Sequence, residues 1–308
     1  MPQLPLTMKS TLTTLAAGLV LAFAAPAFAA DSVATLSAQQ GTVLVNQGDE
    51  IITATEAQPL QAGDRVMVME GGRAEITAGR GSFIESFPLF GYELANYGEL
   101  FEEKLELLVE LLKEKPVTWS GRMRASLTNQ EVYPKTERGA IPLRVGVGGS
   151  PDSVVRAARL GIPMALAIIG GDPARFAPYS NLYKEQLAKF GHAELPVSIH
   201  SPGFIADNDH DAVEAQWPHY ETAFGRIGKE RGWGPTTKMH FISEVNGGSM
   251  YVGSPEKVAK KIAYAIESVG ASRFDLKYAN GPMPHSKLMK AIELYGTKVV
   301  PLVKELLS

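Results

Sequence analysis

The sequence predicts an α/β fold: a partial (β/α) barrel of about five strand–helix units, preceded by a small all-β segment. Three observations support this prediction. From residue 73 onward, apolar strands alternate with amphipathic helices, which is typical of a mostly parallel sheet or barrel. That part has about 236 of the 308 residues, whereas a complete eight-stranded barrel typically takes about 250. Before residue 73, short β-prone stretches are separated by turn residues.

Composition narrows the classes of function. The net charge is −3 with 20% charged residues, so the chain shows no sign of a nucleic-acid or acidic-membrane partner. There is no cysteine, which excludes disulfides, thiolate metal sites and cysteine nucleophiles. The six histidines have no HExxH-type spacing, so no metal site is predicted.

A secretory signal peptide is predicted over residues 1–30. A short basic region at residues 8–9 precedes an apolar run at 12–23 that is too short to span a bilayer, and Ala-Phe-Ala at 27–29 makes an A-x-A cleavage site. The alternative is an uncleaved membrane anchor. A signal peptide predicts export to the periplasm.

A small β segment is predicted over residues 31–71. Short strands are expected near residues 41 and 50, and the stretch at 60–69 alternates around a Gly-Asp turn. The order of a G-x-V-x-V strand, L-x-x-G-D-x-V and G-x-A-x-I resembles the start of a FecR-type periplasmic β domain. The segment is too short for a complete domain, because a few hairpins alone are only marginally stable in water.

The α/β part is expected over residues 72–308. Pro116 ends the first long helix, glycines at 191 and 232 end two others, and Ser254 caps another whose first residue is a proline. Residues 118–134 are expected to be an irregular extended excursion. Strands are predicted at 73–77, 143–147, 164–169, 196–204 and 273–278, and helices at 97–113, 173–190, 209–231, 255–269 and 285–307.

The most informative local pattern is the bend that follows the strand at 143–147. Gly148 and Gly149 have no side-chain bulk, Ser150 is the expected N-cap, and a proline occupies the first helical position. Unpaired backbone N–H groups and the helix dipole both favour an anion there, and the hydroxyls of Ser150 and Ser153 add donors. Two interpretations stay open: a binding site for a phosphate-bearing cofactor, or an ordinary capped helix.

Four stretches, in the right order, resemble the bacterial luciferase-like, flavin-dependent oxidoreductases. They begin Ala-Gly-Arg-Gly-Ser at 78, Val-Thr-Trp-Ser-Gly at 117, Val-Gly-Val-Gly-Gly-Ser-Pro-Asp-Ser at 145 and Tyr-Val-Gly-Ser-Pro-Glu at 251. The resemblance covers about residues 72–308. It implies a TIM barrel, reduced FMN supplied by a reductase, and dioxygen activation for a small organic substrate. It also implies that Arg80 holds the FMN phosphate, with Gly148, Gly149, Ser150 and Ser153 completing the cradle.

The order of elements supports this assignment independently. Arg80 directly follows a predicted strand, so it is expected at the same sheet edge as the bend, where barrel active sites lie. A planar guanidinium opposite free amides and hydroxyls suits a phosphate. The alternative for Arg80 is a salt bridge to Glu85 or another acid. Ser254 is interpreted as a simple helix cap, because no strong apolar strand is expected before it.

The chain departs from the family before residue 72. The resemblance makes the strand at 73–77 the fourth of the barrel, so the first three strands are absent, with a Glu-His-His-type segment that places a histidine near the flavin. The signal peptide and β segment stand in their place, which indicates a fusion, either natural or an assembly error. Polar groups expected near the flavin, at or after strand ends, are His200, Glu244, Asn246 and Asn280.

Three functions therefore stay open. The first is an FMN-dependent monooxygenase or related oxidoreductase, with turnover impaired by the absent strands. The second is an exported binding or signalling protein in which the barrel is a scaffold. The third is an inactive fusion whose open sheet edge promotes aggregation. A homo-oligomer or the β segment would cover that edge. Export also conflicts with the cytoplasmic place expected for a luciferase-like enzyme.

Overall fold

The structure is a computed structural model of the chain, which divides into two units, Met1–Ala30 and Asp31–Ser308. It describes residues 34–40, 43–47, 50–53, 58–60, 65–68, 73–81, 84, 86–133, 135–136, 139–230, 232, 234–279 and 281–308. The predicted signal peptide, the Gly-Asp turn at 63–64, Glu85 and Asn280 lie outside these residues.

A curled parallel sheet forms the centre of the second unit, which confirms the predicted α/β class and half-barrel. Its order is β12-β11-β10-β9-β6-β1-β4, and β13 also pairs with β11. In this sheet, every pairing among the six strands from β6 to β13 is parallel. These strands are β6 (Arg73–Ala78), β9 (Leu143–Val147), β10 (Met164–Ala167), β11 (Val197–Ile205), β12 (Tyr251–Gly253) and β13 (Arg273–Lys277).

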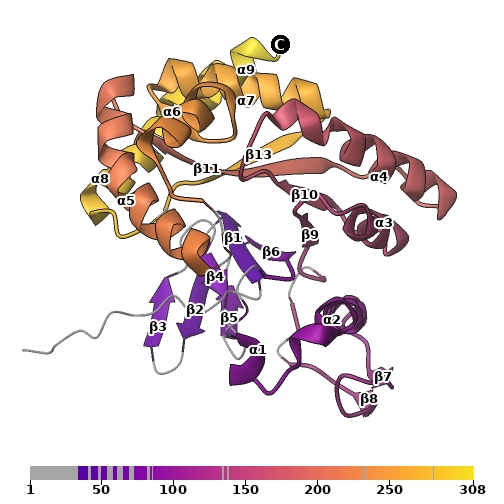
Figure 1. Cartoon of the computed structure of the whole chain (residues 1–308). Helices are drawn as coiled ribbons and strands as arrows, with labels where there is room; N and C mark the ends of the chain where they lie inside the picture. Colours follow the sequence, from indigo (N-terminus) through magenta and orange to yellow (C-terminus); the bar gives the residue numbers. More distant parts are fainter. Residues whose placement is uncertain are drawn as a thin grey trace, which may run out of the picture. The chain divides into compact units, whose positions relative to one another are not determined.

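Helices follow most of these strands, as expected (Figure 1). The predicted C-terminal helix is interrupted by one π-helical turn, η3. The helices are α3 (Pro151–Arg159), η2 (Pro173–Phe176), α4 (Ala177–Lys189), α5 (Asp209–Glu230), α6 (Lys238–Gly247), α7 (Pro255–Val269), α8 (His285–Leu294), η3 (Tyr295–Val299) and α9 (Val300–Leu306). Within the described residues, no helix combines the length and apolar content that crossing a membrane requires.

The N-terminal strands do not all form a sheet of their own. Strands β2, β3 and β5 make a three-stranded antiparallel sheet, whereas β1 pairs antiparallel with β6 and β4 pairs with β1. Strand β1 therefore occupies one edge of β6. The family resemblance implies that the third barrel strand would lie at this edge. The five strands are β1 (Ala34–Gln40), β2 (Val43–Gln47), β3 (Glu50–Thr53), β4 (Gln58–Leu60) and β5 (Arg65–Val68).

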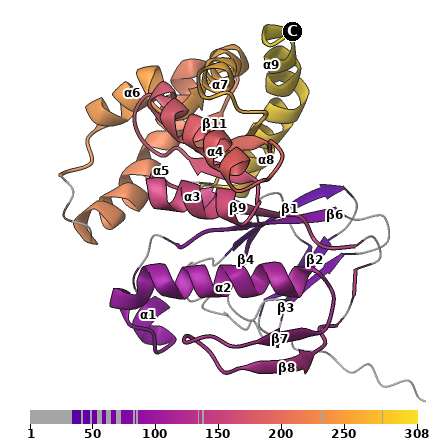
Figure 2. The same cartoon turned by 90° about the vertical axis from the view of Figure 1, so that its right-hand side faces the viewer.

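The chain between β6 and β9 forms a helical excursion and a hairpin. The helix expected at 97–113 is present as α2, and the stretch expected to be irregular contains the antiparallel pair β7–β8, which lies beside α2 (Figure 2). The elements are α1 (Ser86–Leu89), η1 (Leu94–Asn96), α2 (Tyr97–Leu112), β7 (Val117–Trp119) and β8 (Leu127–Gln130).

After β9, two elements were missing from the sequence-based prediction. Strand β12 is buried at all three of its positions and pairs with the end of β11. It makes six parallel strands instead of about five, and it places Ser254 at a strand–helix junction, contrary to the expectation that no strand precedes it. Three residues are too few to show a periodic pattern. Helix α6 was also missed, because its apolar residues show only weak helical spacing.

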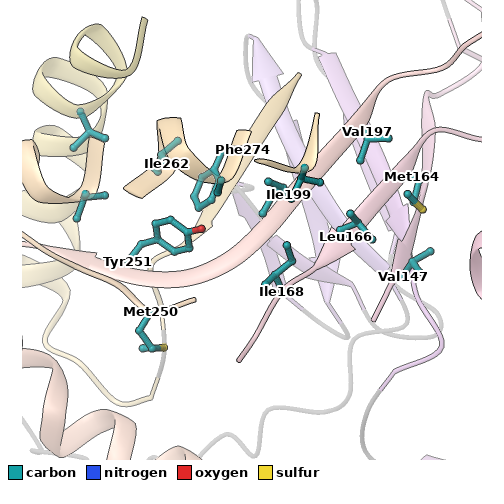
Figure 3. Packing of buried hydrophobic residues seen from close by; sticks show 14 of the residues in the cluster. Val147, Met164, Leu166, Ile168, Val197, Ile199, Met250, Tyr251, Ile262 and Phe274 are labelled. Atoms are coloured by element: carbon teal, nitrogen blue, oxygen red, sulfur yellow. The ribbon is translucent and has the colours of Figure 1, made fainter. Parts of the chain in front are cut away.

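The main core lies between the sheet and the helices. Val147, Leu166, Ile199 and Phe274 are register partners across β9, β10, β11 and β13, so they share one face. All four belong to one buried cluster that includes residues of the covering helices (Figure 3). Because side chains alternate along a strand, the residues between them face the opposite, concave side.

Candidate functional site

Two glycine-containing loops leave the carboxyl edge of neighbouring strands. Strands β6 and β9 are parallel, and their last register pair is Ala78 with Val145. A Cβ built at Gly146 would lie 3.6 Å from the Ala78 carbonyl oxygen and 3.8 Å from the Gly79 Cα. The end of β9 and the turn after β6 are therefore in contact there. The turn that carries Arg80 and the bend at 148–150 therefore start side by side at one edge of the sheet.

The Arg80 side chain stacks on an aromatic ring. Its guanidinium carbon lies 4.8 Å from the centre of the Tyr97 ring, and the Tyr97 hydroxyl donates to the Gly81 carbonyl at 2.6 Å. This stacking uses one face of the guanidinium and leaves the N–H groups on its rim available as donors. No acid in the described part of the chain forms an ion pair with Arg80, and the alternative partner Glu85 falls outside it.

The bend after β9 has an accessible backbone. Gly149 has φ +98°, a conformation that L side chains rarely adopt, and a Cβ at Gly148 would meet nothing within 4 Å. Ser150 begins α3 with extended backbone, and its hydroxyl makes no capping bond, although its carbonyl accepts from the Ser153 amide at 3.0 Å. Ser153 itself is buried on the inner face of α3 with Val154.

These observations fit a phosphate-bearing cofactor. The bend offers an open glycine, a serine hydroxyl not used by its own helix, and the start of a nine-residue helix. The neighbouring turn offers a guanidinium. Every member of this set can donate a hydrogen bond, which is the chemistry that an anion requires.

The concave side of the sheet carries a chain of ion pairs. Glu75 is 5% exposed and accepts hydrogen bonds from the Arg144 Nε and, at 2.8 Å, from the Arg273 Nη1. Arg273 also donates through Nε to Asp275 at 2.6 Å. Since β9, β10 and β11 separate β6 from β13, the Glu75–Arg273 pair spans this face. The face is therefore ionic, while the face toward the helices is apolar.

His200 lies on this concave side, within β11. It is the register partner of Ala167 on one side and of Asp275 on the other. Burial lowers the pKa of the His200 imidazole, Asp275 opposes that shift, and Lys277 adds to it. The imidazole is therefore mainly neutral at pH 7. Burial also lowers the pKa of Lys277.

Glu244 and Asn246 do not lie at strand ends, as the sequence predicted, but on α6. The Glu244 carboxylate accepts from the Gly171 amide at 3.0 Å and from the Ser249 amide at 3.1 Å. The Asn246 side-chain oxygen accepts from Lys257 Nζ at 3.2 Å. Both side chains tie α6 to neighbouring segments, so the structure gives them contacts with the scaffold. The fourth candidate, Asn280, is not among the described residues.

An apolar cavity lies near the Arg80 turn. It has a volume of about 570 Å³, and Ile84, Phe87 and Leu94 are among its lining residues. The Phe87 ring lies 5.6 Å from the Tyr97 ring, on which Arg80 stacks. In the described segments, no group of three or more His, Cys, Asp or Glu is arranged to hold a metal ion.

Sequence reasoning missed the ionic face and the Tyr97 contact. A signal for the ionic face was present. Arg273, Asp275 and Lys277 alternate with the apolar Phe274 and Leu276, which is the pattern of a strand with one charged face. No local pattern joins Glu75 to Arg273, because that pair forms only when the sheet curls.

The family model described as luciferase-like monooxygenase matches residues 67–273. No curated protein sequence matches the chain significantly.

Solved structures share the fold at low sequence identity. A monooxygenase from Streptomyces bottropensis has a TM-score of 0.54 at 19% identity, with 74% of this chain and 68% of that chain covered. The oxygenating constituent of 3,6-diketocamphane monooxygenase from Pseudomonas putida, a type II Baeyer–Villiger enzyme in complex with FMN, has a TM-score of 0.58 at 17% identity, with 74% and 71% covered. An F420-dependent secondary alcohol dehydrogenase, solved with an F420–acetone adduct, has a TM-score of 0.56 at 17% identity, with 74% and 69% covered.

Proposed function

Because the chain belongs to the luciferase-like monooxygenase family, we propose that it is an FMN-dependent oxidoreductase. It binds the FMN phosphate at the carboxyl edge of β6 and β9 and uses reduced flavin and dioxygen to oxygenate a small organic substrate. The observation that carries this proposal is the common origin of the Arg80 turn and the Gly148–Ser150 bend at one sheet edge. Reduced FMN, supplied by a reductase, provides the electrons for dioxygen activation when bound.

The phosphate is held by this chain's own donors. Arg80 binds it with the rim of a guanidinium whose face is held on Tyr97. The backbone of Gly148 and Gly149 and the Ser150 hydroxyl complete the cradle, and Ser153 lies one turn deeper in α3. A terminal phosphate concentrates charge on several oxygens, which suits this number of donors in one place.

A histidine and an apolar cavity supply the proton-transfer group and the substrate surface of the proposed site. His200, mainly neutral and half-buried on the concave face, is suited to accept or donate a proton near pH 7. The cavity lined by Ile84, Phe87 and Leu94 offers an apolar surface to the organic substrate.

FMN binding tests the proposal directly. The purified chain is titrated with FMN and separately with coenzyme F420, since family relatives use either cofactor. Arg80→Ala is compared with Arg122→Ala, whose side chain is 79% exposed and pairs with Glu99 at the surface. Loss of a charge-assisted bond to phosphate is expected to weaken FMN binding by about tenfold or more. The Arg122 variant is expected to bind like the native protein.

Four other outcomes would contradict the proposal. If Arg80→Ala binds FMN normally, Arg80 is not part of the site. If the chain binds F420 more tightly than FMN, F420 is its cofactor in place of FMN. A folded protein that binds neither would support an exported scaffold or signalling protein instead, and an aggregated one would support an inactive fusion.

We also propose that residues 1–30 export the chain to the periplasm and that residues 31–71 descend from a FecR-type segment. Cell fractionation with N-terminal sequencing tests the export. A periplasmic protein that begins at residue 31 supports it, and an intact N-terminus in the cytoplasm contradicts it.

A further inference from the structure

Tyr97 makes two contacts with the turn that carries Arg80. It is the first residue of α2, and the centre of its ring lies 4.8 Å from the Arg80 guanidinium carbon. Its hydroxyl donates at 2.6 Å to the carbonyl oxygen of Gly81, the residue that follows Arg80. One side chain therefore contacts both the guanidinium and the backbone next to it.

A second aromatic residue restrains the Tyr97 ring. The Phe87 ring of α1 lies 5.6 Å from it and is tilted by 43°, and only 8% of Phe87 is exposed. Aromatic pairs at this separation and tilt attract each other beyond the effect of their burial. The Tyr97 ring is thus held through its face by Phe87 or Arg80 and through its hydroxyl by Gly81.

Arg80 depends on this ring for its orientation. Among the described residues, no carboxylate forms an ion pair with its guanidinium. An arginine side chain that moves freely loses rotamer freedom when it binds an anion, and this loss weakens binding. A guanidinium already stacked on a ring has lost part of that freedom beforehand, while the N–H groups on its rim stay available to an anion.

We propose that Tyr97 is a positioning residue for Arg80: its ring holds the guanidinium in the orientation that binds an anion, and its hydroxyl holds the turn after β6. Tyr97 acts on the anion through Arg80. That this anion is the FMN phosphate rests on the function proposed above, but the stacking in the protein without flavin does not.

NMR spectroscopy of the purified chain without flavin tests the positioning. Protons held over the face of an aromatic ring resonate upfield, so the Arg80 side-chain signals are expected upfield of those of Arg122. Arg122 is the control, because its side chain is 79% exposed and pairs with Glu99. Each set of signals is assigned by its loss in Arg80→Ala or Arg122→Ala. Tyr97→Leu is expected to remove the upfield shift, and Tyr97→Phe to keep it.

FMN affinity tests the consequence for the site. Tyr97→Leu is expected to weaken FMN binding about fivefold, and Tyr97→Phe to recover most of this loss. In an Arg80→Ala background, Tyr97→Leu is expected to change the affinity by about twofold or less, because a residue that acts through Arg80 has no effect once that side chain is absent. A purely structural role would lower the affinity equally in both backgrounds.

Three results overturn the proposal: Arg80 signals at the position of the Arg122 signals in the native protein, equal effects of Tyr97→Leu with and without Arg80, and a Tyr97→Phe variant that behaves like Tyr97→Leu. The first result needs no substitution at Tyr97, so it decides the matter if Tyr97→Leu does not fold. Normal FMN binding by Arg80→Ala contradicts the proposed function instead, and the flavin-free NMR result distinguishes the two failures.

Discussion

The two faces of the parallel sheet differ in kind. Toward the helices, β9, β10, β11 and β13 present apolar register partners such as Leu166 and Ile199. On the concave side, Glu75 of β6 pairs with Arg144 of β9 and with Arg273 of β13. Close-packed hydrocarbon stabilises the first face, and paired charges occupy the second.

This difference bears on how a chain without three barrel strands stays folded. An apolar concave face would be exposed once its covering strands were absent. Here the face is ionic, and β1 occupies one edge of β6. These two features reduce the exposed apolar surface that the inactive-fusion interpretation requires. In the described residues, the other edge of the sheet is formed by β12 and β13, which both pair with β11. Strand β13 carries charged residues on its concave side, which disfavours edge-to-edge association there.

The largest effect is expected on the apolar face. Leu166→Ala removes a side chain that is fully buried in the main core, so the free energy of unfolding is expected to fall by about 2–5 kcal/mol. Ile169→Ala is the control, because Ile169 follows the same strand and is 54% exposed. Urea denaturation measures both. Equal losses in the two variants would show that this face is not the main core.

A smaller effect is expected on the ionic face. Glu75→Gln leaves Arg144 and Arg273 without their shared carboxylate, but both guanidinium groups keep some contact with water, with 13% and 26% of the side chain exposed. The expected loss in unfolding free energy is therefore about 2 kcal/mol, below the range for a fully buried pair. Urea denaturation at low and high salt measures it. A gain in stability would mean that desolvation of Glu75 outweighs its two pairings.

The smallest effect concerns pH. The pKa of His200 is lower in the folded protein than in the unfolded chain, where it is near 6.5. The unfolded chain therefore binds more protons as pH falls through that value, and stability is lost in that window. His200→Gln is expected to lose less stability than the native protein between about pH 7 and pH 5. Leu166→Ala, on the other face, should keep the native pH slope. Parallel curves for native protein and His200→Gln would contradict the prediction.

Much of the fold was predictable because its signals are local. The strand at 143–147, the glycine bend and the helix that begins after Ser150 follow from apolar spacing, turn residues and a cap. The same holds for α7, where the Ser254 hydroxyl accepts from the Lys257 amide as an N-cap does. Strand β12 was not predicted in this way, because three residues are too few to show the alternation of a strand.

The candidate site was predictable in part. The sequence placed the Arg80 turn and the bend after β9 at the ends of consecutive parallel strands, and the structure brings those ends together. It misplaced Glu244 and Asn246, because the helix that carries them was not recognised. The stacking of Arg80 on Tyr97 depends on where α2 begins, which no residue pattern near Arg80 indicates.

By itself, the sequence determined the family, the class of fold and the residue types available for binding phosphate, because motifs, periodicity and caps act over short stretches of chain. Only the tertiary structure decided that β1 fills the edge of β6 and that Glu75 meets Arg273 across the concave face. Those contacts join residues far apart in the chain, and they form only when strand twist and curvature bring distant segments within bonding distance.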